Sequence, residues 1–293
     1  MLGSFEAHAL CVGLVVLDQA ARALRIRALT GALGHPLRFG EALSTNAIGD
    51  AACAATPMRL GGEPVRIASL LKFGVPATAC FVAVGFEVIT MWPVIILSAA
   101  GIGYWLAPGW IAHTAPLLLR GLARSWVWLA LVVVGSLLLV LLVRRRVHLT
   151  ARVARRPWRR LLVYGRRMPP GVVLLSAVTT FVNIASRTAI LPILMATLPV
   201  PPPFGPAIVG SFALLFSQMA LPTPSGAGVV DLGLLAGAAG SAGGAEVELL
   251  IWWRFYTTFV GVALGSWLAV RVFGWEVVRR AFKGKGKGKE AAR

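Results

Sequence analysis

Long stretches without any formal charge are the feature that most restricts how this chain can fold. Residues 88–119 and 188–230 contain no charged side chain, and Trp126–Val143 is a continuous apolar run. A helix needs about 20 apolar residues to cross the hydrocarbon core of a bilayer. Of the 293 residues, 57% are hydrophobic and 14% are charged, against about 25% charged in a soluble domain. These numbers fit an integral membrane protein and exclude an ordinary soluble enzyme, a coiled coil or a disordered chain.

The apolar stretches predict an all-α, polytopic membrane protein. We expect spans at about residues 3–21, 77–106, 126–143, 171–198 and 247–272, with two interrupted regions at about 40–74 and 204–245. They form one predicted transmembrane domain over 1–273, in which a basic cytoplasmic loop (144–170) separates half one (1–143) from half two (171–273). The lysine–glycine repeat within 274–293 predicts a flexible basic cytoplasmic tail.

The positive charges are concentrated next to the predicted spans. The chain has 29 Lys and Arg against 11 Asp and Glu, a formal net charge of +18. Of the 29, 25 fall in three groups: Arg22 to Lys72, residues 144–167, and Arg271 to the end. The positive-inside rule then predicts a cytoplasmic 144–167 loop and C-terminus and an external N-terminus. The expected location is a bacterial-type inner membrane. This grouping disfavours a nucleic-acid partner, although the basic loop alone also suits RNA or anionic lipid headgroups.

The two interrupted regions have the same order of residue types. An apolar segment is followed by Thr56-Pro57, glycines and Glu63 in the first, and by Thr223-Pro224, glycines and Asp231 in the second. The predicted topology places them on opposite membrane faces, which indicates two inverted repeats, each with a re-entrant hairpin, around a central cavity. The alternative is a pair of ordinary loops, because proline and glycine end helices everywhere. The expected hairpin backbone consists of Thr56, Pro57, Gly61, Gly62, Pro222, Pro224, Gly226 and Gly228.

These motifs resemble the transmembrane region of lysylphosphatidylglycerol synthases, a family that includes stand-alone flippase-like proteins. The likeness rests on Asn46 with TPMRLGGEPVR at 56–66, on Glu87, and on LPTPSGAGVVD at 221–231 with Arg254; it covers about residues 20–272. Asp231 stands where the family often has glutamate, and the extra N-terminal helix of many members is not evident. The resemblance implies movement of a phospholipid, anionic or aminoacylated, across the bilayer.

Charges inside predicted spans are costly and therefore indicate function. Arg187, Arg254 and Glu87 are such charges, and Asn183 shares a helix face with Arg187. Arginine binds phosphate bidentately, and helix N-termini after the prolines present N–H groups to an anion. The expected substrate-binding residues are Asn46, Arg59, Glu63, Glu87, Asn183, Arg187, Asp231 and Arg254. A structural alternative for Glu87 is that it neutralises Arg187 or Arg254 inside the bundle.

The leading hypothesis is a lipid flippase or transporter that moves a phospholipid or lipid-linked headgroup through a polar groove. The sequence contains no nucleophile–base grouping, phosphate loop or Cys/His ligand spacing, so we expect no enzymatic activity, no cofactor and no metal. One alternative is a non-transporting scaffold that partners a lipid-modifying enzyme through the basic loop. Another is a small-solute transporter, whose cavity opens to water and not to lipid.

Overall fold

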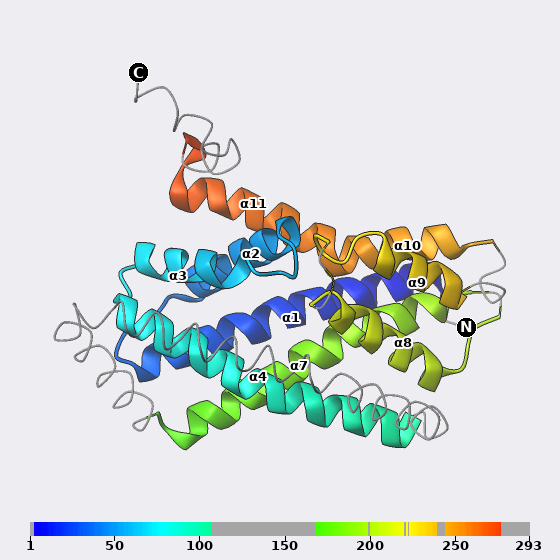
Figure 1. Ribbon diagram of the computed structural model, residues 1–293, viewed down its shortest axis with the longest axis horizontal. Helices are drawn as coiled ribbons and strands as arrows, with labels where there is room; N and C mark the ends of the chain where they lie inside the picture. The colour runs from blue at the N-terminus through cyan, green and yellow to red at the C-terminus, as the bar shows by residue number, and fades with distance from the viewer. Residues whose placement is uncertain are drawn as a thin grey trace, which may run out of the picture.

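The computed structural model describes residues 3–106, 168–198, 200–219, 221, 223–238 and 244–276, and within these ranges the regular elements are helices (Figure 1). In chain order they are α1 (Ser4–Ala32), α2 (Phe39–Ala55), α3 (Gly62–Lys72), α4 (Ala77–Leu106), α7 (Pro170–Met195), α8 (Phe204–Ser217), α9 (Val229–Ala238), α10 (Glu246–Arg254), the π-helix η2 (Phe255–Phe259) and α11 (Val260–Phe273). The predicted all-α architecture is confirmed.

Within the described residues, three helical segments are long and apolar enough to cross a membrane. They are α4, α7 and the continuous segment α10–η2–α11 over Glu246–Phe273. Their bounds agree with the predicted spans at 77–106, 171–198 and 247–272. The predicted span at 126–143, the 144–167 part of the basic loop and the tail from residue 277 lie outside the described residues, as does Pro222.

The first helix is longer than predicted. The sequence predicts a span ending near residue 21 with a group of basic residues after it, but α1 continues to Ala32. Arg22 and Arg25 therefore belong to α1, and both are buried, as is Arg66 on α3. Each pairs with a carboxylate from another helix, which offsets the cost of burying a charge. These three arginines were counted among the charges that lie beside the spans and set orientation, and their burial inside the bundle corrects that interpretation.

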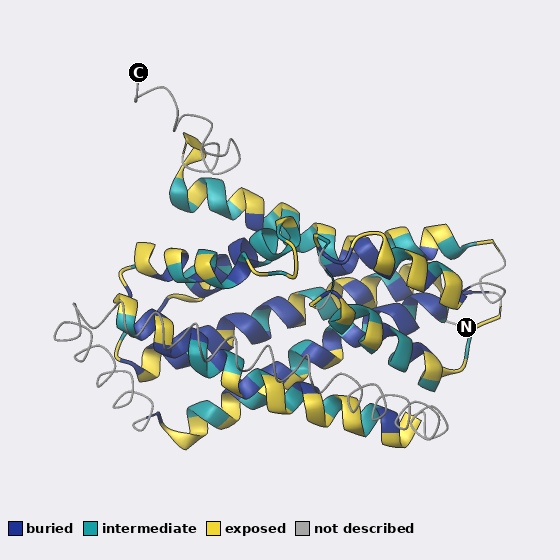
Figure 2. Ribbon diagram, viewed as in Figure 1, coloured by how far each residue is buried: buried dark blue, intermediate teal, exposed yellow. Residues whose placement is uncertain are grey.

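Helix α1 packs against α2, α4, α7 and η2 (Figure 1), while Phe5, Val12 and Val16 are exposed on another face. Figure 2 shows buried residues along much of α1 and exposed residues on the outer faces of α4 and α7. On α7, Leu174, Val178 and Phe181 follow each other at helical spacing and are 50–66% exposed. Such an uncovered stripe of large apolar side chains indicates contact with lipid.

Helices α2 and α11 approach closely at a glycine. A Cβ atom added to Gly265 would overlap the backbone carbonyl oxygen of Ala47. Small residues permit this kind of backbone approach between membrane helices. The contact fixes α2 one turn before Asp50, and it thereby helps to position that carboxylate.

One turn follows α2, and a second turn with a similar backbone precedes α9. They cover residues 56–61 and 223–228. In each turn, the two residues after the proline are left-handed, with φ between 51° and 67°: Met58 and Arg59 in the first, Ser225 and Gly226 in the second. The same hydrogen bond closes both, from Arg59 N–H to the Thr56 carbonyl (3.3 Å) and from Gly226 N–H to the Thr223 carbonyl (3.1 Å). The Thr-Pro motifs therefore produce the same backbone at the two residues after the proline, whereas the closing glycines differ: φ is −72° at Gly61 and 86° at Gly228.

The two turns touch each other. Pro57 and Pro224 form an isolated antiparallel bridge, and the Ser225 hydroxyl donates to the carbonyl of Ala54 at 3.4 Å. In Figure 1 both turns lie roughly halfway along the long helices. Segments about 167 positions apart in the sequence, Pro57 and Pro224, therefore meet inside one bundle.

Candidate functional site

A small, partly open pocket lies next to the first Thr-Pro turn. Its walls come from α1, the end of α2, the turn itself, α7, η2 and the start of α11. Five of its lining side chains are charged: Asp18, Arg22, Asp50, Arg59 and Arg187. A polar space with charged walls is unusual in a bundle whose outer surface is apolar, and it is the candidate functional site.

Arg22 joins the two aspartates of the pocket. Its Nη1 and Nη2 donate to the two oxygens of Asp50 at 2.7 and 2.6 Å, a bidentate pair. Nη2 also donates to Oδ2 of Asp18 at 3.0 Å. Asn183 donates to the other oxygen of Asp18, and Gln19 to Oδ2 of Asp50 at 3.5 Å. This cluster ties α1 to both α2 and α7.

Two further arginines face the pocket without a carboxylate partner in the described part of the chain. Arg187 Nη2 donates to the Thr257 carbonyl at 2.7 Å, and Arg59 Nη1 donates to Oε1 of Gln218 at 3.2 Å. Arg59 also has a left-handed backbone (φ 58°), which costs about 1–2 kcal/mol for a residue with a Cβ. Strained residues of this kind cluster at functional sites.

A π-helical turn forms the wall opposite Arg187. Tyr256, Thr257 and Thr258 of η2 line the pocket. Single π-turns inside longer helices are frequent at functional sites. The Tyr256 hydroxyl lies 3.0 Å from Nδ1 of His8, so η2 also contacts the first part of α1.

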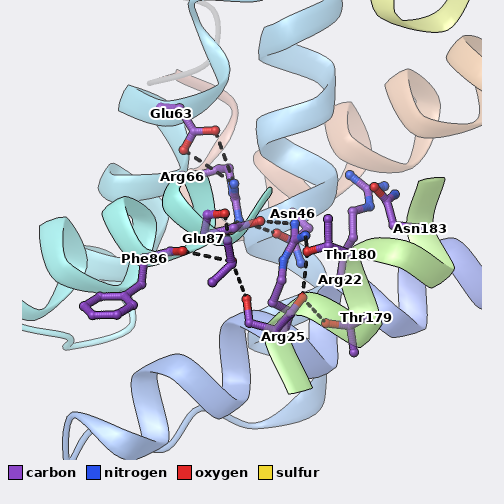
Figure 3. A network of polar contacts seen from close by, with 12 residues as sticks. Arg22, Arg25, Asn46, Glu63, Arg66, Phe86, Glu87, Thr179, Thr180 and Asn183 are labelled. Atoms are coloured by element: carbon purple, nitrogen blue, oxygen red, sulfur yellow. Dashed lines mark hydrogen bonds and ion pairs between the residues drawn. The ribbon is translucent and has the colours of Figure 1, made fainter. Parts of the chain in front are cut away.

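A second charged network, centred on Glu87, is buried and includes none of the residues that line the pocket; Figure 3 shows it beside Arg22 and Asn183. Glu87 is 3% exposed and forms ion pairs with both Arg25 and Arg66. Arg25 also donates to Thr180 Oγ1 at 2.8 Å, and Arg66 to Asn46 Oδ1 at 2.9 Å. The network joins α1, α2, α3, α4 and α7. Glu87 is therefore neutralised inside the bundle, but by Arg25 and Arg66. The prediction that Arg187 or Arg254 would be its partner was wrong.

Arg254 and Asp231 hold the second Thr-Pro turn. Arg254 Nε donates to Oδ1 of Asp231 at 2.6 Å, and its Nη1 donates to the Ser225 carbonyl at 3.0 Å. The other Asp231 oxygen accepts from the Gly228 N–H at 3.0 Å. In the first turn the equivalent glycine, Gly61, donates instead to Thr56 Oγ1 at 2.8 Å. The two turns therefore end differently, since Gly61 is right-handed (φ −72°) and Gly228 is left-handed (φ 86°).

We expect Asp231→Ala to lower the free energy of unfolding by about 1–3 kcal/mol, because it leaves the buried Arg254 guanidinium without its carboxylate. SDS titration of the purified protein in mixed micelles measures this loss. Arg254→Lys keeps the charge but not the two-pronged contact, so a smaller loss is expected. An Asp231→Ala protein as stable as the native one would contradict this role.

The eight predicted substrate-binding residues fall into three places. Arg59 and Arg187 line the pocket, and Asn183 contacts its Asp18. The remaining five lie in the Glu87 network or at the second turn: Asn46, Glu63, Glu87, Asp231 and Arg254. Glu63 is the outermost member of its network, since its side chain is 46% exposed.

Sequence reasoning missed three charged pocket residues, Asp18, Arg22 and Asp50. Asp18, Arg22 and Arg25 recur at intervals of four and three, which places them on one helix face. That signal was available, but ending the first span near residue 21 concealed it. Asp50 has no comparable local signal, because its partner Arg22 is 28 residues away.

The lipid-facing helices and the buried charged pocket define a helical, multi-pass membrane protein. A family model described as the lysylphosphatidylglycerol synthase TM region matches residues 4–265. The chain belongs to this family, which confirms the resemblance carried by the Thr-Pro motifs. Comparison with curated proteins and with solved structures gives no significant match.

Proposed function

We propose that this protein moves a phospholipid or lipid-linked headgroup between the two leaflets by way of the charged pocket. The observation that carries the proposal is a pocket with five charged side chains inside a bundle with apolar outer helices. A headgroup needs a polar path through the membrane, while its acyl chains stay in hydrocarbon. Membership of a lipid-related membrane family supports the proposal. In this function the protein carries out no covalent chemistry.

We further propose that α2–α3 and α8–α9 are re-entrant hairpins of two inverted repeats. Each hairpin consists of helices of 10 to 17 residues, below the length of about 20 that spans a bilayer. Each turn has two left-handed residues after its proline, and the turns meet at Pro57 and Pro224. Paired broken hairpins that meet near a binding site are typical of transporters. The proposed location is the inner membrane, with the 144–167 loop and the C-terminus cytoplasmic.

The contact between the turns provides a direct test. Residues opposed across an antiparallel bridge have Cα atoms about 4.5–5.5 Å apart, so a Pro57→Cys/Pro224→Cys pair is expected to form a disulfide on mild oxidation. In proteoliposomes with labelled phospholipids, the reduced protein is expected to accelerate translocation between leaflets. The oxidised double variant is expected to fall to the rate of protein-free vesicles, because movement of one repeat against the other requires the turns to separate.

The two single cysteine variants are the matched controls, since they retain Cys11, Cys53 and Cys80 and respond to oxidation only through those thiols. Dithiothreitol is expected to restore transport in the double variant. Absence of protein-dependent translocation across a broad headgroup panel would refute the transport proposal and favour the scaffold. Uptake of water-soluble solutes without lipid movement would favour the small-solute transporter.

A further inference from the structure

The acidic side of the pocket is already paired with donors of the protein. Each carboxylate oxygen of Asp18 and Asp50 receives a hydrogen bond from Arg22, Asn183 or Gln19. An amine on a lipid headgroup would have to compete with Arg22, whose charge already compensates both aspartates. The aspartates are therefore poorly suited to hold a cationic headgroup.

The arginines on the basic side of the pocket have hydrogen-bond donors that the described residues leave unused. Arg59 and Arg187 each make a side-chain hydrogen bond to one neutral acceptor, the Gln218 amide oxygen and the Thr257 carbonyl. Nε of Arg22 is a buried nitrogen without a hydrogen-bond partner among the described residues. Within the same part of the chain, none of the guanidinium nitrogens of Arg59 and Arg187 is both buried and without a partner. The free donors of Arg59 and Arg187 are therefore accessible, and both side chains line the pocket.

The charge of the lining matches a single anion. Three arginines and two aspartates give the pocket walls a formal charge of +1. An uncompensated cation inside a membrane bundle is costly, and one bound negative charge removes that cost. A phosphodiester carries one negative charge, and its oxygens fit the planar fork of arginine. A phosphodiester that also carries an amine brings no net charge and leaves the pocket uncompensated.

The backbone at Arg59 gives independent support. Arg59 is left-handed, and the equivalent position of the second turn is Gly226, the residue that adopts this conformation without strain. The turn itself therefore has no need of a side chain at position 59. A strained arginine whose side chain lines a pocket is explained if the side chain contacts a ligand there.

We infer that the pocket binds a monoanionic phosphodiester headgroup that carries no amine, with Arg59 and Arg187 as its phosphate ligands. This inference rests on the proposed function, which supplies the reason that a lipid enters the pocket. It adds the chemical class of the substrate. Soluble glycerol phosphodiesters share the same chemistry. The test therefore uses three probes in neutral detergent: dioctanoyl phosphatidylglycerol, its aminoacyl ester and glycerophosphoglycerol.

Isothermal titration is expected to give about tenfold or tighter affinity for phosphatidylglycerol than for its aminoacyl ester. Arg187→Gln and Arg59→Gly are each expected to weaken phosphatidylglycerol binding about tenfold or more, the loss of one charge-assisted contact. Arg27→Gln, at an exposed position of α1, is the control and is expected to bind as the native protein does. Arg59→Gly also removes backbone strain, so its thermal midpoint is expected to stay level with that of the control.

Equal or tighter binding of the aminoacyl ester overturns the inference, and so does native affinity in both arginine variants. A thermal midpoint of Arg59→Gly well below that of Arg27→Gln would show that Arg59 has a structural role. The inference would then depend on the phosphatidylglycerol affinity of Arg187→Gln. Glycerophosphoglycerol binding as tight as that of the lipid supports the anion site and assigns its ligand to solution. Binding of phosphatidylglycerol without translocation in vesicles refutes the proposed function but supports the inference.

Discussion

Glu87→Ala is expected to lower the free energy of unfolding by about 3–5 kcal/mol, the usual cost of removing one partner from a buried ion pair. Glu87 is the shared carboxylate of Arg25 and Arg66, so its loss leaves two buried guanidinium groups without their counter-ion. Because these side chains come from α1, α3 and α4, the change weakens several helix contacts together. SDS titration in mixed micelles, followed by tryptophan fluorescence, measures the loss.

The matched control is Glu63→Ala, which removes a carboxylate from the same Arg66. The Glu63 side chain is 46% exposed and its ion pair spans 3.3 Å within one helix, so a loss of about 1 kcal/mol or less is expected. A Glu87→Ala protein no less stable than Glu63→Ala would show that the buried network contributes little to the fold. Glu87 would then require a functional explanation.

Gly265→Ala is expected to destabilise the protein by about 1–3 kcal/mol or more, through overpacking of α11 against α2. The added methyl group would overlap the Ala47 carbonyl oxygen and lie 2.7 Å from its carbonyl carbon. Both are backbone atoms, so no side-chain rotation relieves the clash, and the helices must move apart. The same SDS titration measures the change, and a reduced rate of lipid translocation is expected to accompany it, since α2 bears Asp50.

Gly13→Ala is the control for this change. Gly13 is also helical, but nothing lies within 4 Å of a Cβ added there. Alanine is favoured over glycine inside a helix by about 0.5–1 kcal/mol, so this variant is expected to be slightly more stable. Opposite signs for the two substitutions would establish the close helix contact, whereas equal effects at both positions would argue against it.

The parts of the fold that are encoded locally were predicted well. The spans at 77–106, 171–198 and 247–272 follow from runs of apolar residues, and the two Thr-Pro turns follow from proline and glycine. Each depends only on residues close together in the chain. The pairing of charges depends on tertiary contacts instead, and here sequence reasoning was incomplete.

Arg22 and Arg25 illustrate the difference. Taken with their neighbours, they look like the basic flank of a short span, which the positive-inside rule assigns to the cytoplasm. Their burial depends on Asp50 and Glu87, which lie 28 and 62 residues away. No single-sequence pattern pairs charges over that separation, so two of the arginines attributed to topology belong to the interior.

The proline contact between the turns has a consequence for how the bundle moves. Neither Pro57 nor Pro224 has a backbone N–H, so the pair cannot exchange hydrogen bonds with each other. Separating the prolines therefore leaves no orphaned N–H on either residue, and what holds the turns together is the contact itself and the hydrogen bond from the Ser225 hydroxyl to the Ala54 carbonyl. A serine side chain, and not the backbone of the two prolines, is thus the polar link that must break before the two turns can part.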